Sequence, residues 1–352
     1  MPETCRTENT GARNVPDDKI VSWLRLADEG WIYLTDSQIH RLLMTQVEPF
    51  MERLERFYAS WPEEREILLP VKQVFTQPGL RGDFRVMPCV VHSRRLKCVK
   101  IIGTNEEQRR IKDKICVGKA LLIDYTDNHV FALMDVCVLS SFRTAAIACL
   151  ALARSGLKPA SIGLCGVGRI GFYMAVILHR WLGCRRLVCH DPDCAIRQRF
   201  EWLCSEYLPE LRVDFLAQAE LLTTVEAVFL ATTSQTPLCY QENAGHLRFI
   251  ASVGADADNL SELDESLMRT HRLITDSRQS ICLGDMKRWH QAGLLAEDRL
   301  TELRDLDANA LVDGQSLLFV STGVALQDAL VCEFLYEIGA QHNAPVFAGE
   351  GW

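Results

Sequence analysis

The sequence has no CxxC pair, although cysteine is abundant, with 14 in 352 residues. Zinc ribbons and thioredoxin-type redox sites need two cysteines at that short spacing, so we expect neither, and we predict no metal site. Most of the cysteines stand in apolar runs such as "MPCVV" and "ALVCEF". In such runs a free thiol behaves as a small hydrophobic side chain.

The sequence also lacks a block of positive charge and a long apolar run. The formal net charge is -8 and the basic residues are scattered, which argues against nucleic acid as the partner. No stretch approaches the 18 or so apolar residues of a membrane span, and the N-terminal "MPETCRTENTGARNVPDD" has no signal-peptide core. We therefore expect a cytoplasmic protein with reduced thiols and a small-molecule ligand, not a membrane or nucleic-acid partner.

The length indicates two domains. "WIYL" predicts a strand, and an amphipathic helix follows with its N-cap in the cluster of Thr35, Asp36 and Ser37. Short β-rich runs then predict a sheet up to about residue 135. A helix follows over "VLSSFRTAAIACLALARSGLKPA", with Ser140 or Ser141 as its cap and Gly156 at its end.

From Ser161 strands alternate with helices, which is typical of a parallel sheet with crossover connections. The last part of the chain predicts a strand, a glycine turn and a helix that packs back on the first domain. We therefore predict an α/β protein with a Rossmann domain inside a discontinuous α+β domain. The boundaries are 1–145 and 315–352 for the outer domain and 146–314 for the Rossmann domain.

A dinucleotide-binding loop is predicted in "SIGLCGVGRIGFYMAVIL". Its three glycines allow a tight turn, a close approach to the pyrophosphate and close packing of helix on strand. The helix that follows presents free N–H groups to phosphate. The predicted loop contacts are Gly166, Val167, Gly168, Arg169, Ile170 and Gly171.

The next strand, "RRLVCHD", ends in Asp191, where a carboxylate accepts hydrogen bonds from the ribose hydroxyls. An acidic residue there repels a 2′-phosphate, so NAD is favoured over NADP. The alternative for Asp191 is an N-cap of the following helix. Thr232 and Thr233, in "ATTSQTP" after a later strand, are expected to line the same cofactor site.

Hydride transfer to a nicotinamide needs groups outside the Rossmann domain that hold the donor carbon. Three basic residues of the β-rich part are candidates, namely Lys72, Lys100 and Arg143. The segments "VKIIG", "FALMDVCVLSSFRTAA", "ASVGADADNLSELD" and "STGVALQD", in this order around the glycine loop, resemble the ornithine cyclodeaminase and mu-crystallin family. The resemblance covers about three quarters of the chain. It implies that the outer domain binds substrate and forms a homodimer.

The resemblance also implies roles for single residues. It places the catalytic lysine at Lys100, the carboxylate-binding arginine at Arg143, a second cationic contact at Lys72 and the catalytic aspartate at Asp256. Arg143 can hold an α-carboxylate as a bidentate fork, and Lys100 adds a second positive charge. Asp256 can take a proton from the amine or activate water. Solvated surface charges, and a turn residue in the case of Asp256, are the alternatives.

One departure bears on the substrate. The cyclodeaminases have a glutamate near a Met-Pro pair, where it meets the distal ammonium of the substrate; here "FRVMP" has Arg85. Arg85 suits a distal carboxylate instead, provided that it points inward. This chain looks closer to the branch that oxidises an N-linked amino acid in 2,3-diaminopropionate biosynthesis. The alternatives are an ornithine cyclodeaminase, without net redox change, and a mu-crystallin-like ligand-binding protein.

Overall fold

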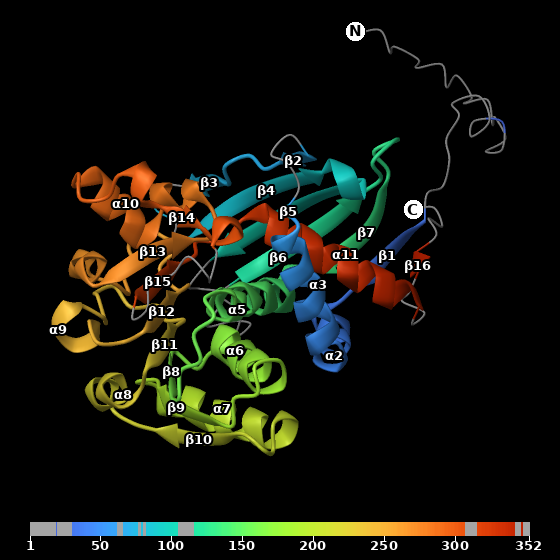
Figure 1. The fold of residues 1–352 in the computed structure, drawn as a ribbon. Helices are drawn as coiled ribbons and strands as arrows, with labels where there is room; N and C mark the ends of the chain where they lie inside the picture. Colours follow the sequence, from blue (N-terminus) through green and yellow to red (C-terminus); the bar gives the residue numbers. More distant parts are fainter. Residues whose placement is uncertain are drawn as a thin grey trace, which may run out of the picture.

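Two sheets and the helices between and around them make up the protein, as the computed structural model shows (Figure 1). The structure describes residues 30–61, 66–76, 79, 82–104, 116–306, 315–341 and 346–347, together with residue 19. The segment "VKIIGTNEEQRRIKDK", which continues the "VKIIG" motif, therefore lies partly outside the described residues, and the predicted N-terminal tail over 1–18 lies outside them.

The first sheet follows the order β16-β1-β7-β6-β5-β4-β2, with β3 also on β4. All its neighbours are antiparallel except β1 and β7. Its strands are β1 (Trp31–Leu34), β2 (Ile67–Leu68), β3 (Gln73–Thr76), β4 (Asp83–Val91), β5 (Leu96–Thr104), β6 (Cys116–Ile123), β7 (Val130–Asp135) and β16 (Val346–Phe347). The β-rich region predicted up to residue 135 is thus confirmed.

Helices α2 (Asp36–Thr45), α5 (Val136–Arg154) and α11 (Ala325–Gln341) pack on the inner face of this sheet, and α3 (Val47–Ala59) packs on these three helices. Thr35 is the N-cap of α2, as predicted, and it forms a capping box with Gln38. The predicted single helix is broken at Gln46, which separates α2 from α3. Apolar residues of all four helices join the core with the inner face of the sheet.

Helix α5 begins at Val136, earlier than the predicted cap at Ser140 or Ser141. Asp135 occupies the N-cap position, and the Ser141 hydroxyl donates within the helix to the carbonyl of Cys137 (2.8 Å). The hydroxyl of a serine can bond one turn back inside a helix, so serine alone does not mark a start. Gly156, with φ +68, follows the helix end as predicted.

Within the described part of the chain one helix, α5, is long and apolar enough to span a membrane by length and composition, although none was predicted. Of its most apolar window, 83% is buried inside the protein, between α6, α11 and β6. Such burial is typical of the central helix of a folded core.

The second sheet is entirely parallel, in the order β10-β9-β8-β11-β12-β15-β13-β14. Its strands are β8 (Ile162–Cys165), β9 (Arg186–His190), β10 (Arg212–Phe215), β11 (Ala227–Leu230), β12 (Phe249–Ser252), β13 (His271–Thr275), β14 (Thr301–Glu302) and β15 (Ser316–Val320). The helices α6 (Arg169–Arg180), α7 (Cys194–Tyr207), α8 (Gln218–Thr224), α9 (Gln241–Ala244) and α10 (Gly284–Gln291) connect them.

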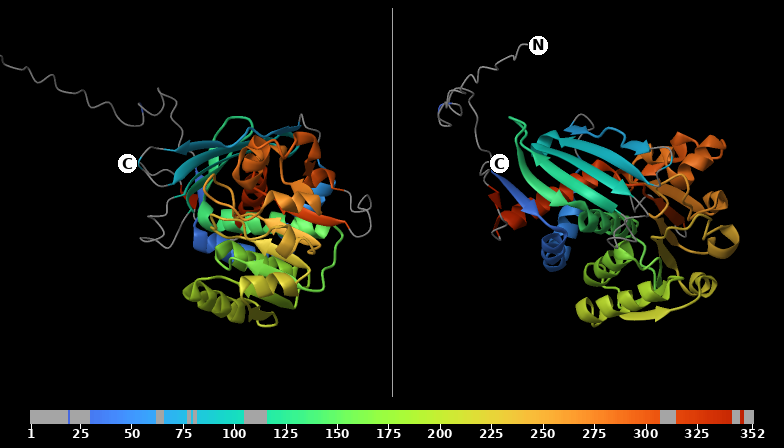
Figure 2. Two further views of the ribbon diagram at one scale, coloured as in Figure 1. Left: turned by 90° about the vertical axis from the view of Figure 1, so that its left-hand side faces the viewer. Right: turned by 180° about the vertical axis from the view of Figure 1, so that it is seen from behind.

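Strand β15 belongs to this second sheet, between β12 and β13. The chain therefore returns to the first sheet only at residues 321–324, later than the predicted boundary at 315. The return itself agrees with the prediction, because α11 packs on β4, β5 and β6. Figure 2 shows α11 lying along the inner face of the first sheet, close to the second sheet at one end.

Candidate active site

Four loops meet at the carboxyl edge of the second sheet, after the neighbouring strands β8, β11, β12 and β15. They span residues 166–168, 231–240, 253–264 and 321–324. Ligands of open parallel sheets bind at this edge. The predicted glycine loop, threonines and Asp256 all lie in these loops.

The glycine loop has the shape that a dinucleotide needs. Gly166 has φ +87, and a Cβ there would lie 2.4 Å from the carbonyl oxygen of Ala231. A Cβ on Gly171 would lie 2.3 Å from the carbonyl oxygen of Gly166, so helix α6 packs closely on the loop. Gly168 is the N-cap of α6 and has open space beside it. An open, side-chain-free N-terminus of a long helix fits a pyrophosphate.

The remaining loop positions differ in exposure. Val167 is buried, Ile170 is half-buried and Arg169 is exposed. The backbone N–H of Val167 donates to Oδ2 of Asp191 (3.0 Å), which links the loop to the end of β9.

Asp191 is not the N-cap of the following helix. That position belongs to Asp193, whose side chain accepts from the backbone N–H groups of Ala195 and Ile196. Asp191 is buried against the glycine loop, and its Oδ1 accepts from the N–H of Asp193 (3.0 Å). The structure therefore puts the Asp191 carboxylate beside the loop.

Glu262 organises the threonine loop and was not predicted. It is fully buried and accepts from Thr232 N–H (2.6 Å), the Thr232 hydroxyl (2.8 Å), the Ser252 hydroxyl (2.6 Å) and Gly254 N–H (2.9 Å). Burial raises the pKa of Glu262, although these hydrogen bonds favour the charged carboxylate and oppose the rise. Thr233 is exposed in the same loop. Nothing in "NLSELDESL" distinguishes a buried glutamate from a solvated one.

The inner face of the first sheet presents two cations. In the β4–β5 ladder Arg85 pairs with Ile102, and Met87 pairs with Lys100. Arg85 shares its face with the buried Met87, and both Arg85 and Lys100 are themselves buried. Arg85 therefore points inward, the orientation that a substrate contact needs.

Lys100 and Arg143 share a buried carboxylate on α11. The Asp328 side chain lies 2.7 Å from Lys100 Nζ and accepts from Arg143 Nε at 3.0 Å. Burial lowers the pKa of Lys100 to about 8, although the charge of Asp328 opposes this. Gly323 has φ +78, and a Cβ there would lie 2.4 Å from Arg143 Nη1. Only a glycine leaves the room that this guanidinium occupies.

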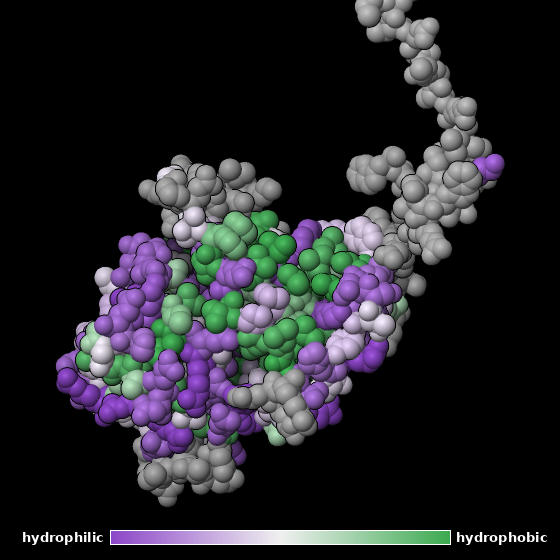
Figure 3. All heavy atoms as spheres, turned by 90° about the horizontal axis from the view of Figure 1, so that it is seen from above, coloured by the Kyte–Doolittle hydropathy of each residue, from purple (hydrophilic) through white to green (hydrophobic). Residues whose placement is uncertain are grey.

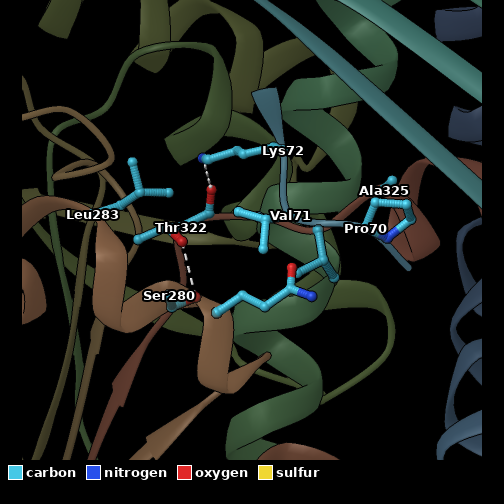
Figure 4. A pocket seen from close by; sticks show the side chains of 10 residues that line it. Pro70, Val71, Lys72, Ser280, Leu283, Thr322 and Ala325 are labelled. Atoms are coloured by element: carbon cyan, nitrogen blue, oxygen red, sulfur yellow. Dashed lines mark hydrogen bonds between the residues drawn. The ribbon is translucent and has the colours of Figure 1, made fainter. Parts of the chain in front are cut away.

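Lys72 reaches the loop after β15 from the first sheet. Its Nζ donates to the carbonyl of Thr322 (2.6 Å), beside a pocket lined by residues 70–72, 279–280, 283 and 322–325 (Figure 4). Burial lowers the pKa of Lys72 to about 8, and the charges of Arg85, Arg143 and Lys100 contribute. These four cations are therefore gathered in one place.

Asp256 meets this group of cations from the second sheet. Its Oδ2 accepts from Arg85 Nη1 at 2.5 Å. Burial favours a raised pKa of Asp256, but the charges of Arg85 and Lys72 outweigh it and lower the pKa. Asp256 N–H donates to the carbonyl of Gly254 (3.1 Å), and a Cβ on Gly254 would lie 2.2 Å from the Thr232 carbonyl oxygen.

A continuous set of contacts thus joins the glycine loop to the cations. It runs from Gly166 through Ala231 and Thr232 to Gly254, and then through Asp256 to Arg85. All five predicted charged residues are brought together: Lys72, Arg85, Lys100, Arg143 and Asp256. Asp328 lies inside this group, between Lys100 and Arg143.

Comparison with known proteins decides the family. Residues 34–343 match the sequence model of the ornithine cyclodeaminase/mu-crystallin family. The chain belongs to this family. The resemblance inferred from the motifs is thus confirmed.

A curated family relative is the iminosuccinate reductase of Paracoccus denitrificans, 27% identical over 318 residues, which are 86% of this chain and 94% of that protein. Among solved structures, the Δ1-pyrroline-2-carboxylate reductase of Thermococcus litoralis, in complex with NADH and L-proline, superposes with a TM-score of 0.78 at 20% identity, covering 89% of this chain and 98% of that one.

An archaeal alanine dehydrogenase dimer with bound NAD gives a TM-score of 0.76 at 19% identity, covering 90% of this chain and 99% of that one. These two structural likenesses establish the fold. The predicted α/β class is confirmed.

Proposed function

We propose that this family member is an NAD-dependent oxidoreductase that acts on the carbon–nitrogen bond of an amino or imino acid. The observation that carries the proposal is the meeting of four cations with Asp256 beside the glycine loop. Cations bind carboxylates, and a carboxylate at the sheet edge can exchange a proton with a nitrogen.

NAD is the proposed cofactor. The glycines leave an open cradle at the N-terminus of α6, and Asp191 beside it suits free ribose hydroxyls. Gly166, Val167, Gly168, Arg169, Ile170, Gly171, Asp191, Thr232 and Thr233 would hold it. The family relatives solved with NADH or NAD support the same cofactor. When bound, NAD accepts a hydride, and its reduced form returns one.

The protein residues would position the substrate and move its protons. Arg143 and Lys100 hold the α-carboxylate, with Lys72 as a further contact, so that the nitrogen-bearing carbon faces the cofactor. That carbon loses a hydrogen with its two electrons, and the nitrogen loses a proton to Asp256, which leaves a carbon–nitrogen double bond. In the hydrolytic direction, water then adds to that carbon. Reduction of an imine is the reverse of the first step.

An acidic substrate is favoured by Arg85. It is buried, points inward and is the cation that replaces the glutamate of the cyclodeaminases. The relative named iminosuccinate reductase acts, by its name, on a dicarboxylic compound. We propose an N-linked acidic amino acid of 2,3-diaminopropionate-type biosynthesis as the substrate in the oxidative direction.

The test is incubation with NAD and a panel of amino acids and N-carboxyalkyl amino acids, following absorbance at 340 nm and product masses. We expect NADH to accumulate with an acidic member and a keto acid to appear. Conversion of ornithine to proline without NADH would instead indicate a cyclodeaminase. Tight binding of a ligand without any absorbance change would indicate a binding protein.

The assembly that we propose is a homodimer formed by the outer face of the first sheet. No described helix covers that face, and apolar side chains gather on it (Figure 3). Phe84 is 49% exposed and Ile101 43%. Exposed apolar patches of this kind mark interfaces, and the alanine dehydrogenase relative is a dimer.

A further inference from the structure

The ion pair between Arg85 and Asp256 joins the two sheets across the proposed substrate site. We propose that it is a latch opened by an acidic substrate: the distal carboxylate of the substrate replaces Asp256 on Arg85, and Asp256 is thereby released to exchange a proton with the substrate nitrogen. This inference rests on the proposed function. It makes Arg85 both the contact for the second carboxylate and the control on the catalytic aspartate.

The geometry leaves one edge of the Arg85 guanidinium exchangeable. Its Nε and Nη2 bind Asp83 at 3.1 and 2.9 Å, and Asp83 also accepts from the Thr104 hydroxyl at 2.9 Å. Asp83, Arg85 and Thr104 all belong to the β4–β5 ladder. Nη1 binds Asp256, which comes from the second sheet.

Asp256 is the partner that can leave. Its side chain is 35% exposed, whereas that of Arg85 is 7% exposed and that of Asp83 is 11% exposed. Asp256 stands in the loop after β12, and Arg85 stands inside a nine-residue strand with neighbours on both sides. A carboxylate that enters from the open side therefore competes with Asp256 and not with Asp83.

The charges of the site match an acidic amino acid. Arg85 pairs with Asp83 and Asp256, and Lys100 and Arg143 pair with Asp328. Lys72, whose hydrogen-bond partner is the backbone carbonyl of Thr322, adds a further positive charge close to Arg85. A second carboxylate on the substrate therefore enters a group of cations, whereas a substrate with a single carboxylate leaves Arg85 to Asp256.

Release changes the basicity of Asp256. While paired, the charges of Arg85 and Lys72 lower its pKa, which makes it a weak base toward an ammonium group. When the substrate carboxylate neutralises Arg85, this effect is reduced and Asp256 becomes the stronger base. A neutral substrate leaves Asp256 on Arg85, so the latch selects for acidic substrates through the proton transfer as well as through binding.

Binding of unreactive ligands tests the latch without relying on turnover. We would measure by calorimetry the binding of succinate and of its monoamide succinamate to the NAD-saturated full chain. In Asp256→Asn the competing carboxylate is gone, so we expect succinate to bind about tenfold more tightly than in the wild type, with little change for succinamate. In Arg85→Gln, and in the double variant with both Arg85→Gln and Asp256→Asn, succinate should not show this tenfold gain in affinity.

The matched control is Asp258→Asn, which removes an exposed carboxylate paired with Lys287 in the same loop and should leave succinate affinity unchanged. Succinate binding that is no tighter in Asp256→Asn than in the wild type, or absent throughout, overturns the latch. Failure of every amino or imino acid to change NAD(H) absorbance overturns the proposed function instead. The two results are separate because the binding experiment needs no chemistry.

Discussion

At the scale of single residues, Asp328 is the group that controls the charge of the carboxylate site. It is fully buried and contacts both Lys100 and Arg143. With a pKa of about 8, Lys100 is charged below that pH and loses its charge above it. Since only the charged lysine attracts a carboxylate, KM for the amino acid should rise as pH passes upward through this range.

Asp328→Asn should move that rise to lower pH, because the carboxylate is what opposes the effect of burial on Lys100. At pH 7.5 we expect KM to increase about tenfold or more, since truncating one partner of a buried charge pair costs about 2–5 kcal/mol. The measurement is the pH dependence of KM, with melting temperature as a check of folding. Asp328→Glu should restore the wild-type profile; an unshifted profile in Asp328→Asn would contradict this role.

At the scale of elements, the sequence predicts strands and helices well but not which face of a strand is inside. Strand β4 is apolar on both faces, with Val86, Pro88 and Val90 on one and Met87 and Cys89 on the other. The usual alternation of polar and apolar residues is therefore missing in β4, and the sequence does not reveal that Arg85 points inward. The start of α5 was missed for a related reason, since Ser141 bonds inside the helix as well as it would at a cap.

The glycine loop and the end of β9 form one unit, because Asp191 accepts from Val167 N–H. Asp191→Asn should weaken NADH binding about tenfold and narrow the difference between NADH and NADPH, since the carboxylate that repels a 2′-phosphate is gone. Titration of both nucleotides by fluorescence measures this. Asp193→Asn, at the N-cap of α7, keeps the oxygen that caps the helix and should leave the NADH-to-NADPH ratio unaltered. Equal NADH-to-NADPH affinity ratios in the wild type, Asp191→Asn and Asp193→Asn would be evidence against Asp191 as the ribose contact.

At the scale of the whole molecule, the site depends on contacts that sequence patterns alone do not contain. Arg85 and Asp256 are 171 positions apart, and Arg143 and Asp328 are 185 apart. The family motifs predicted four of the five charged residues, and the local departure "FRVMP" predicted the fifth, Arg85. Glu262 and Asp83 were not found, because each acts only through partners that the fold brings to it.

The outer face of the first sheet carries the last prediction. In register across β4, β5 and β6, Val86 faces Ile101 and Val99 faces Leu121, so apolar pairs run over three strands, with Lys119 opposite Ile101 on the same face. A stable interface buries about 800 Å² per partner, and an uncovered apolar sheet face is suited to supply it.

Phe84→Glu puts a charge on this face and should convert the dimer into monomers, because burial of an unpaired carboxylate opposes association. Light scattering after gel filtration gives the mass directly. Trp202→Glu changes a residue that is 59% exposed on α7, which packs on the second sheet, and should leave the mass of the dimer intact. If the wild-type chain is monomeric at micromolar concentration, or if Phe84→Glu stays dimeric, the apolar face does not mediate self-association.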